Sequence, residues 1–502
     1  MPTRHLQRQS SGIETLNKPA GGKLWPAEFK LFTSLLRDSI PVILSYILQN
    51  SIQTVSIVIA GRLGAHELSA STFRDLGDLV GLILVKSALS PGWCIALGGT
   101  TALDTLGSQA FTGSSRPTDL SVHLQRCILL LWILLLPVCI TWAFIEPILV
   151  ALGQPADLAA DVQKFLRVLI VGAPGYVGFE SLKKYLQCQG IMELSTTALL
   201  IMSPLNVVFN LVLIHHSPLG LLGSPLALSM TYWVAFALLV VLTIRSPVHR
   251  SNETWGGIQL SRVLHARSCL TFLKLALPGI LMVGTEWAAF EIVALCAGNL
   301  GALPLAAQSV IMTFDQILNT LPFGIGVAAS NRVGNLIGAK QAEHAKRAAH
   351  FSALLSVVVG VVVMTLLVVF KDVCGYVLSD DEDVVALVSK VMPLVASFQI
   401  SDGLAGSCGG VLRGQGRQHL GAFFNFMAYY VIALPLGITL AFNERTKLGL
   451  QGLWIGQVVG LTIVGLGEYF VVWLGTDWQL EVEKGVARNM TEGQDESAID
   501  AS

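Results

Sequence analysis

Long apolar stretches recur along the chain and are separated by short polar ones. Between Ile40 and Leu474, about twelve stretches reach the roughly 20 residues that a helix needs to cross a hydrocarbon core of about 30 Å. The strands of a membrane barrel would be about ten residues long and would alternate in polarity, which these stretches do not. The pattern predicts an all-α integral membrane protein. The stretches centre near Leu48, Ile95, Ile133, Val171, Met202, Phe236, Glu291, Ile317, Val361, Val395, Tyr430 and Val464.

The composition also indicates that the bilayer is the solvent of this chain. Charged residues make up 13% of the 502 residues, whereas an ordinary soluble protein has about 25%, and mean hydropathy is +0.64. The net charge of -1 argues against a nucleic-acid partner. The eight cysteines show neither a disulfide framework nor a metal-ligand spacing. We therefore expect no metal and no other cofactor.

Basic residues in the short loops predict the orientation. The opposite loops are poorer in them and include the acidic run Asp380 to Asp383. We therefore expect both termini in the cytoplasm. The plasma membrane and the vacuolar membrane stay open as the location of the protein. The basic residues in or beside the even-numbered loops are Arg116, Arg126, Lys183, Lys184, Arg245, Arg250, Arg262, Arg267, Arg332, Lys340, Lys346, Arg347, Arg413 and Arg417.

The two halves of the chain repeat one another. The stretch LRDSIPVILSYILQNSIQTVSIVIAGRLGAHELSA (residues 36–70) aligns without a gap with LKLALPGILMVGTEWAAFEIVALCAGNLGALPLAA (residues 273–307), at a shift of 237 residues. Pro41 then meets Pro278, and Gln49 falls opposite Glu286. Six spans in each half give both halves the same orientation, with a pseudo-symmetry axis along the membrane normal. The repeat predicts two six-helix pseudo-symmetric lobes.

The repeat also divides the chain into domains. We expect a cytoplasmic tail (1–35), a first lobe (36–245), a cytoplasmic linker (246–268), a second lobe (269–476) and a C-terminal cytoplasmic tail (477–502), whose polar composition is typical of disorder. The shift falls to 227 where Gly107 meets Gly334, so the first half carries about ten extra residues within 71–92. An extracellular extension, a functional charged cluster and a retained intron are three open interpretations of this excess.

Acidic side chains inside the spans are the candidate functional groups. A charged side chain at the centre of a span costs about 2.5 to 3.5 kcal/mol on insertion scales, so such a residue marks an ion or substrate path. A poorly solvated carboxyl can exchange a proton for a cationic substrate; alternatively, a protonated acid only bonds a neighbouring helix. Glu286 and Glu291 point about 140° apart on a regular helix, so one narrow site does not take both unless the helix bends. The acids are Glu286, Glu291, Asp315 and Asp402.

Other features of these spans allow a functional and a structural interpretation. The glycine-rich span around Asp402 permits bending, and it also permits close helix packing. Trp287, Tyr429 and Tyr430 can face an organic cation, although most membrane aromatics pack or anchor. Asp315 lies on a polar face that can serve helix packing alone. The sequence contains no phosphate-binding loop and no catalytic motif, which argues against an ATP-driven pump and against an enzyme.

Four motifs resemble one known family. ALDTLGSQAF (102–111), LPGILMVGTEWAAFEIVALCAG (277–298), AASNRVGNLIGA (328–339) and GGVLRGQGRQHLGAFFN (409–425) are similar to those of eukaryotic multidrug and toxic compound extrusion (MATE) transporters of the fungal branch. The similarity runs in order from Arg37 to Trp473, and the excess within 71–92 departs from it. The resemblance implies twelve helices in two lobes around a central cavity, and export of organic cations, drugs or metabolites in exchange for protons or sodium.

The resemblance also implies where the coupling acids lie. Eukaryotic members place essential acids in the second lobe, and the motifs match these to Glu286, Glu291 and Asp402. Prokaryotic relatives use an acid in the first helix, where this chain has Gln49 and Asn50. We predict that Glu286 and Asp402 couple transport to protons, with Glu291 as a further candidate. Other side chains expected at the cavity are Gln49, Asn50, Trp287, Asp315, Tyr429 and Tyr430.

Two alternatives to proton-coupled export stay open. Sodium can replace the proton as the coupling ion. A flippase of related architecture for a lipid-linked substrate would need basic residues in its cavity, and the central spans offer acids instead. The expected partners are an organic cation, protons or sodium, and the lipid bilayer, and we expect a monomer.

Overall fold

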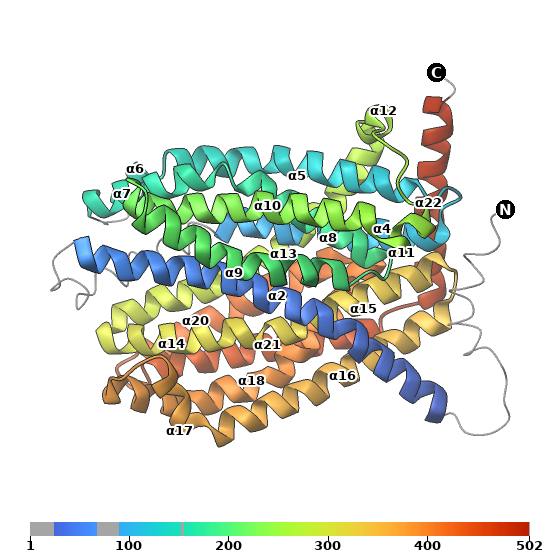
Figure 1. Ribbon diagram of the computed structural model, residues 1–502. Helices are drawn as coiled ribbons and strands as arrows, with labels where there is room; N and C mark the ends of the chain where they lie inside the picture. The colour runs from blue at the N-terminus through green and yellow to red at the C-terminus, as the bar shows by residue number, and fades with distance from the viewer. Residues whose placement is uncertain (1–24, 68–89, 152–154, 501–502) are drawn as a thin grey trace.

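The computed structural model describes residues 25–67, 90–151 and 155–500, and long helices dominate it (Figure 1). Within these segments, ten helices are long and apolar enough to cross a membrane, and two shorter helices bent by 51° form an eleventh span. The expected span near Ile95 falls partly on residues 68–89, which lie outside the described residues. Its described part is a helix over residues 90–99 followed by α4 (Thr101–Gly113). The predicted all-α membrane architecture is confirmed.

The helices of the first lobe pack around an apolar core and turn further apolar side chains outward. Leu131, Leu135 and Trp142 lie in that core, whereas Leu136 and Ile140 on the same helix are mostly exposed. Such an exposed apolar belt suits lipid rather than water. The elements are α2 (Trp25–Glu67), α4, α5 (Asp119–Ala143), α6 (Glu146–Ala151), α7 (Ala156–Leu169), α8 (Ala173–Cys188), α9 (Glu193–His215), η2 (Gly220–Leu222) and α10 (Gly223–Arg245), with α7 and α8 forming the bent span.

The second lobe repeats this plan. Two spans are composite, because α14 continues into α15, and α19, η4 and α20 follow one another without a gap. The elements are α11 (Pro247–Asn252), α12 (Leu260–Val263), α13 (Ala266–Leu300), α14 (Ala302–Leu318), α15 (Thr320–Gly338), α16 (Ala342–Val369), α17 (Lys371–Cys374), η3 (Gly375–Val377), α18 (Glu382–Gln415), α19 (Gln418–Asn425), η4 (Phe426–Ala433), α20 (Leu434–Phe442), α21 (Leu450–Trp473) and α22 (Trp478–Asp500). The short helices α11 and α12 occupy the predicted linker, and the predicted domain bounds stay predictions.

Polar contacts between the lobes gather at one end of the two bundles. Thr105 donates to the carbonyl of Arg413 at 2.5 Å, and Gln109 donates to the carbonyl of Gly414 at 2.9 Å. Glycine allows the close approach, since a Cβ on Gly334 would lie 1.8 Å from Ser108 Oγ. We call this region the joined end; it comprises α4, the C-terminal ends of α8, α15 and α18, and α22.

The predicted disorder of the C-terminal tail is wrong. Residues 478–500 form the helix α22, which crosses the joined end at a steep angle to the other helices (Figure 1). Trp478 and Val482 are buried in an apolar cluster of the second lobe, with Val486 packed against it. These three residues are spaced four apart and therefore share one face of a helix. The polar composition of the whole tail masked this stripe.

Arg488 of α22 links the two lobes directly. Its guanidinium donates to Gln109 Oε1 of α4 at 3.0 Å and to the carbonyl of Gln415 at the end of α18 at 3.1 Å. The adjacent Asn489 donates to the carbonyl of Gln109 at 3.1 Å. The helix α22 therefore bridges α4 of the first lobe and α18 of the second.

The contacts of Arg488 predict that Arg488→Ala loosens the joined end. Cys188 reports on this, because its buried Sγ lies 3.3 Å from Leu103 O and 3.5 Å from Asn331 Oδ1 of the other lobe. Hydrogen bonds to a charged group contribute about 1.5 to 3 kcal/mol, so N-ethylmaleimide should modify Cys188 roughly tenfold faster in the variant. Residue-resolved mass spectrometry measures the rate. Arg445→Ala, at an exposed arginine between α20 and α21, is the control; equal rates in both variants would contradict the prediction.

Candidate functional site

Side chains of the second lobe line a small cavity of about 40 Å³. This volume has room for a few water molecules and is well below the range of about 300 to 1,000 Å³ that is usual for small-molecule sites, so an organic cation requires the cavity to widen. The wall draws on α13, α15, α18, α19, η4 and α21, together with the residue between α14 and α15. The lining residues are Met282, Val283, Glu286, Trp287, Asn319, Pro322, Phe323, Asp402, Ala405, Gly406, Arg413, Asn425, Tyr429, Leu461, Val464 and Glu468.

Three carboxyl groups from three different helices reach this cavity. Glu286 on α13 is half-buried, Asp402 on α18 is 4% exposed, and Glu468 on α21 is fully buried. The amide of Asn319 donates to both carboxylate oxygens of Asp402 at 3.3 Å. Asn319 sits at the junction of α14 and α15, so the break in that span positions the donor. The cavity is therefore acidic, and few protein groups balance the charge of its three carboxyl groups.

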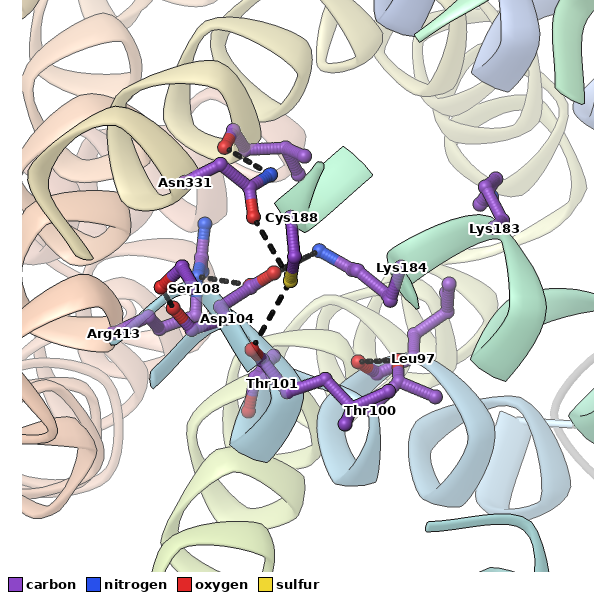
Figure 2. A network of polar contacts seen from close by, with 12 residues as sticks. Leu97, Thr100, Thr101, Asp104, Ser108, Lys183, Lys184, Cys188, Asn331 and Arg413 are labelled. Atoms are coloured by element: carbon purple, nitrogen blue, oxygen red, sulfur yellow. Dashed lines mark hydrogen bonds and ion pairs between the residues drawn. The ribbon is translucent and has the colours of Figure 1, made fainter. Parts of the chain in front are cut away.

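Arg413 is the one basic residue among the lining side chains. It lies two residues before the end of α18, and its guanidinium is 5.6 Å from the centre of the Phe323 ring. Its Nε lies 3.8 Å from Asp104 Oδ2, which belongs to α4 of the first lobe. Lys184 of α8 donates to both oxygens of Asp104 at 2.9 and 3.0 Å. Figure 2 shows Lys184 and Arg413 approaching Asp104 from the two lobes.

Three aromatic side chains line the cavity, namely Trp287 on α13, Phe323 on α15 and Tyr429 on η4. The π-helical turn η4 contains Tyr429 and Tyr430, and such turns recur at functional sites. Tyr429 lines the cavity and is fully buried, with its ring 6.2 Å from that of Phe290. Tyr430 instead donates to the carbonyl of Thr285 at 3.0 Å. The two tyrosines thus have different neighbours, and only Tyr429 is among the described lining residues.

The structure brings together four of the predicted site residues, which are Glu286, Asp402, Trp287 and Tyr429. Glu291 lies on α13 outside the cavity wall, as expected from its angle to Glu286 on a helix that stays continuous. Asp315 is buried on α14 and is also not among the lining residues.

Gln49 and Asn50 lie in the first lobe, away from this cavity. Gln49 is buried, donates to Tyr176 Oη at 2.7 Å and accepts from Lys183 Nζ at 2.9 Å. Lys183 also pairs with Glu180 at 2.7 Å, so a buried cation and its counter-ion on α8 lie beside Gln49, the residue that the repeat aligns with Glu286. Asn50 donates to the carbonyl of Gln316 at 3.4 Å, across the boundary between the lobes.

The sequence reasoning missed five polar or aromatic lining residues: Asn319, Phe323, Arg413, Asn425 and Glu468. Glu468 meets the criterion that selected the other acids, because it lies inside the twelfth apolar stretch. Asn425 closes one of the family-like motifs, and its amide donates to the carbonyl of Met282 at 2.8 Å, which holds α19 against α13. No sequence signal singles out Asn319 or Phe323.

Four basic residues used to predict the orientation are buried within long helices. Lys183 and Lys184 lie in α8, Arg126 lies in α5, and Arg413 lies in α18. Each lies near the end of a predicted span, where sequence position alone does not separate a loop from a helix end. The remaining basic residues carry the orientation argument, and the orientation stays a prediction.

Comparison with known proteins identifies the family. The MatE family model matches residues 41–212 and 278–439. The chain belongs to the MatE family. The two matched segments begin 237 residues apart and end 227 residues apart, which are the two shifts of the internal repeat. MatE proteins are transporters of the multidrug and toxin extrusion class, so the predictions of a multi-pass membrane transporter and not an enzyme are confirmed.

The relatives of this MatE protein include named and uncharacterized transporters. An uncharacterized transporter of Schizosaccharomyces pombe is 35% identical over 448 residues, which are 89% of this chain and 80% of that protein. Multidrug and toxin extrusion protein 2 of Mus musculus is 34% identical over 471 residues, 93% of this chain and 78% of that protein. The crystal structure of the eukaryotic MATE transporter AtDTX14 has a TM-score of 0.80 at 28% identity, covering 91% of this chain and 100% of that one.

The buried cluster at Asp104 predicts a large stability effect for Asp104→Asn. Lys184 and Arg413 would both stay buried while losing their counter-ion, and breaking a buried ion pair costs about 3 to 5 kcal/mol. The melting temperature in detergent should therefore fall by several degrees, as measured by intrinsic fluorescence. Glu343→Gln, at an exposed pair with Arg347, should change it little, because exposed pairs contribute little. Equal melting temperatures for the two variants would contradict the prediction.

Proposed function

We propose that this MatE protein is a secondary active transporter that exports organic cations, drugs or related metabolites in exchange for protons. The observation that carries the proposal is the second-lobe cavity, in which Glu286, Asp402 and Glu468 face a single base, Arg413. Its excess of acid favours a cationic substrate over an anionic one. The names of relatives, which include multidrug and toxin extrusion protein 1 of Homo sapiens, support the same class of substrate.

The poor solvation of these acids supplies the coupling. An ionised carboxylate away from water needs a cation beside it, whereas a protonated one does not. A proton and a substrate cation therefore compete for the same carboxylates, and competition for one site is the basis of exchange. In this proposal Glu286 and Asp402 are the coupling acids. Asn319 keeps donors on Asp402, so that its carboxylate is tolerated once the proton has left.

The arrangement of the lobes supports a direction for the cycle. On the predicted topology both termini and the joined end face the cytoplasm, so the cavity is shut from the cytoplasm in this conformation. Protons from the acidic side neutralise the acids and release the cation there. Separation of the joined end then lets the protons leave to the cytoplasm and a new cation enter. Each ligand shifts this equilibrium only by its different affinity for the two conformations.

The alternatives make different demands on the site. A flippase for a lipid-linked substrate needs basic groups for an anionic headgroup, and among the lining residues only Arg413 is basic. Sodium as the coupling ion would use the same carboxylates, and the choice of ion is a question for the transport assay. We further propose a monomer with the domain bounds given above, in the plasma or the vacuolar membrane.

The proposal predicts that a pH gradient drives uptake of labelled tetraethylammonium into proteoliposomes. Glu286→Gln and Asp402→Asn should each reduce the initial rate by roughly tenfold or more, because each removes a carboxylate that must bind the proton and the cation in turn. Uptake under a sodium gradient alone would identify sodium as the coupling ion. If both variants transport at the wild-type rate, these acids are not the coupling groups. No uptake by the wild type under either gradient would overturn the substrate class.

A further inference from the structure

Glu468 is a buried acid without a partner. It lies on α21, its side chain is fully buried, and neither carboxylate oxygen has a hydrogen-bond partner among the residues that the structure describes. Asp402, by contrast, is held by Asn319. An ionised carboxylate left alone in a protein interior costs several kcal/mol. Glu468 therefore carries a proton in this conformation.

The space around the Glu468 carboxyl group is shaped by glycine. A Cβ on Gly409 of α18 would lie 3.2 Å from Oε2, and a Cβ on Gly421 of α19 would lie 3.1 Å from Oε1. The same two positions would place a Cβ 2.5 and 2.6 Å from the end of the Met282 side chain. Both helices thus have glycine where they pass the Glu468 carboxyl group and the end of Met282. A larger residue at either position would clash with these side chains.

Charged and titratable groups face Glu468 from each neighbouring element that carries them. Arg413 on α18 and Glu286 on α13 interact with it electrostatically. Cys408 on α18 and Tyr429 on η4 do so as well. Arg413 lies one turn beyond Gly409 on the same helix. Its Nε and Nη2 have no hydrogen-bond partner within the described part of the chain.

The counter-ion of Arg413 is on the other lobe. Asp104 belongs to α4 in the first lobe, whereas Arg413 belongs to α18 in the second, and Asp104 Oδ2 lies 3.8 Å from Arg413 Nε. Any motion that separates the lobes at the joined end removes Asp104 from Arg413. Asp104 keeps Lys184 in its own lobe. Arg413 then requires a carboxylate of the second lobe, and Glu468 is an acid beside it without another partner.

We propose that Glu468 is a third proton-carrying acid of the cavity, whose carboxylate replaces Asp104 as the partner of Arg413 when the joined end opens. The O–H bond of the Glu468 carboxyl breaks, the proton passes to water in the opened cavity, and the carboxylate pairs with Arg413. This step rests on the proposed function only for its place in a transport cycle. The proton of Glu468 is tied to the motion of the lobes, whereas those of Glu286 and Asp402 are tied to the substrate.

The first experiment measures opening without any substrate. Purified protein in lipid nanodiscs is treated with N-ethylmaleimide across a pH series, and modification of Cys188 is followed by mass spectrometry. The thiol is the same in wild type and Glu468→Gln, so the ratio of their rates isolates the effect of Glu468. Loss of the pairing carboxylate should slow modification of the variant about tenfold at high pH, since hydrogen bonds to charged groups are stronger than those between neutral groups. At low pH, where Glu468 is protonated in the wild type, the two rates should converge.

Matched variants keep the experiment decisive. Glu468→Asp retains a titrating acid and should keep a pH-dependent rate, and Glu343→Gln, at an exposed glutamate, should follow the wild type. If Glu468→Gln does not fold, as judged by its melting curve, Glu468→Leu takes its place in the same comparison, because it also removes the titrating acid from this buried position. Equal rates for wild type and Glu468→Gln at every pH overturn the proposal.

A second measurement separates this proposal from the proposed function. In proteoliposomes, the pH gradient that just balances a tetraethylammonium gradient gives the number of protons exchanged per cation. Glu468→Gln should exchange one proton fewer than the wild type while its apparent affinity for tetraethylammonium stays the same. An unchanged proton number contradicts the role of Glu468. Absence of transport by the wild type contradicts the proposed function, and the Cys188 measurement still tests Glu468.

Discussion

A charge that is buried away from water needs a partner, and at Asp104 one carboxylate meets that need for both lobes. Lys184 reaches it from α8 of the same lobe and Arg413 from α18 of the other (Figure 2). Apolar contacts between helices in a bilayer gain little over contacts with lipid, so polar contacts and small residues decide where helices meet. The ionic cluster and Gly334 act together in this way. Gly334 allows α15 to approach α4 closely, and the charges at Asp104 determine which helices meet there. The position of the cavity follows, because the same α18 that carries Arg413 to the joined end carries Asp402 into the cavity wall.

The two lobes share a fold and differ in how their charges are balanced. In the first lobe Lys183 is bonded to both Glu180 and Gln49, so its buried charge is neutralised within the lobe. The internal repeat places Gln49 opposite Glu286, whose lobe provides no such lysine among the described cavity residues. An amide suffices at a site where the cation is already paired, whereas an acid at a site without a cation has to take a proton or a ligand. The buried lysine of the first lobe is therefore paired within that lobe, whereas the carboxyl groups that line the second-lobe cavity have Arg413 as the one basic residue among the lining side chains.

The sequence predicted those features that depend on local pattern. The length of the apolar stretches predicted the spans, and the internal repeat predicted the two lobes. The rarity of acids inside spans singled out Glu286 and Asp402, which both line the cavity. Each of these signals is carried by residues that are close together in the sequence. Pairings between distant segments were not predictable: Arg413 and Lys184 read as loop charges, since nothing in their neighbourhood reveals that Asp104 of α4 receives both. The helix α22 was missed for another reason, because its apolar stripe of Trp478, Val482 and Val486 was diluted by the polar residues between them.

Arg413 is where the chemistry of the cavity meets the contact between the lobes. Coupling over a distance does not require a long chain of intermediates if one side chain belongs to both sites, and Arg413 lines the cavity while pairing with the first lobe. Separation of the lobes would break the pair between Asp104 and Arg413, and the two residues would not be affected equally. Asp104 would keep Lys184 at 2.9 Å and so would keep a counter-ion. The uncompensated charge falls on Arg413 alone, and therefore on the second lobe. That lobe holds the cavity acids, so in the cycle proposed above their protonation state sets the electrostatic cost of opening.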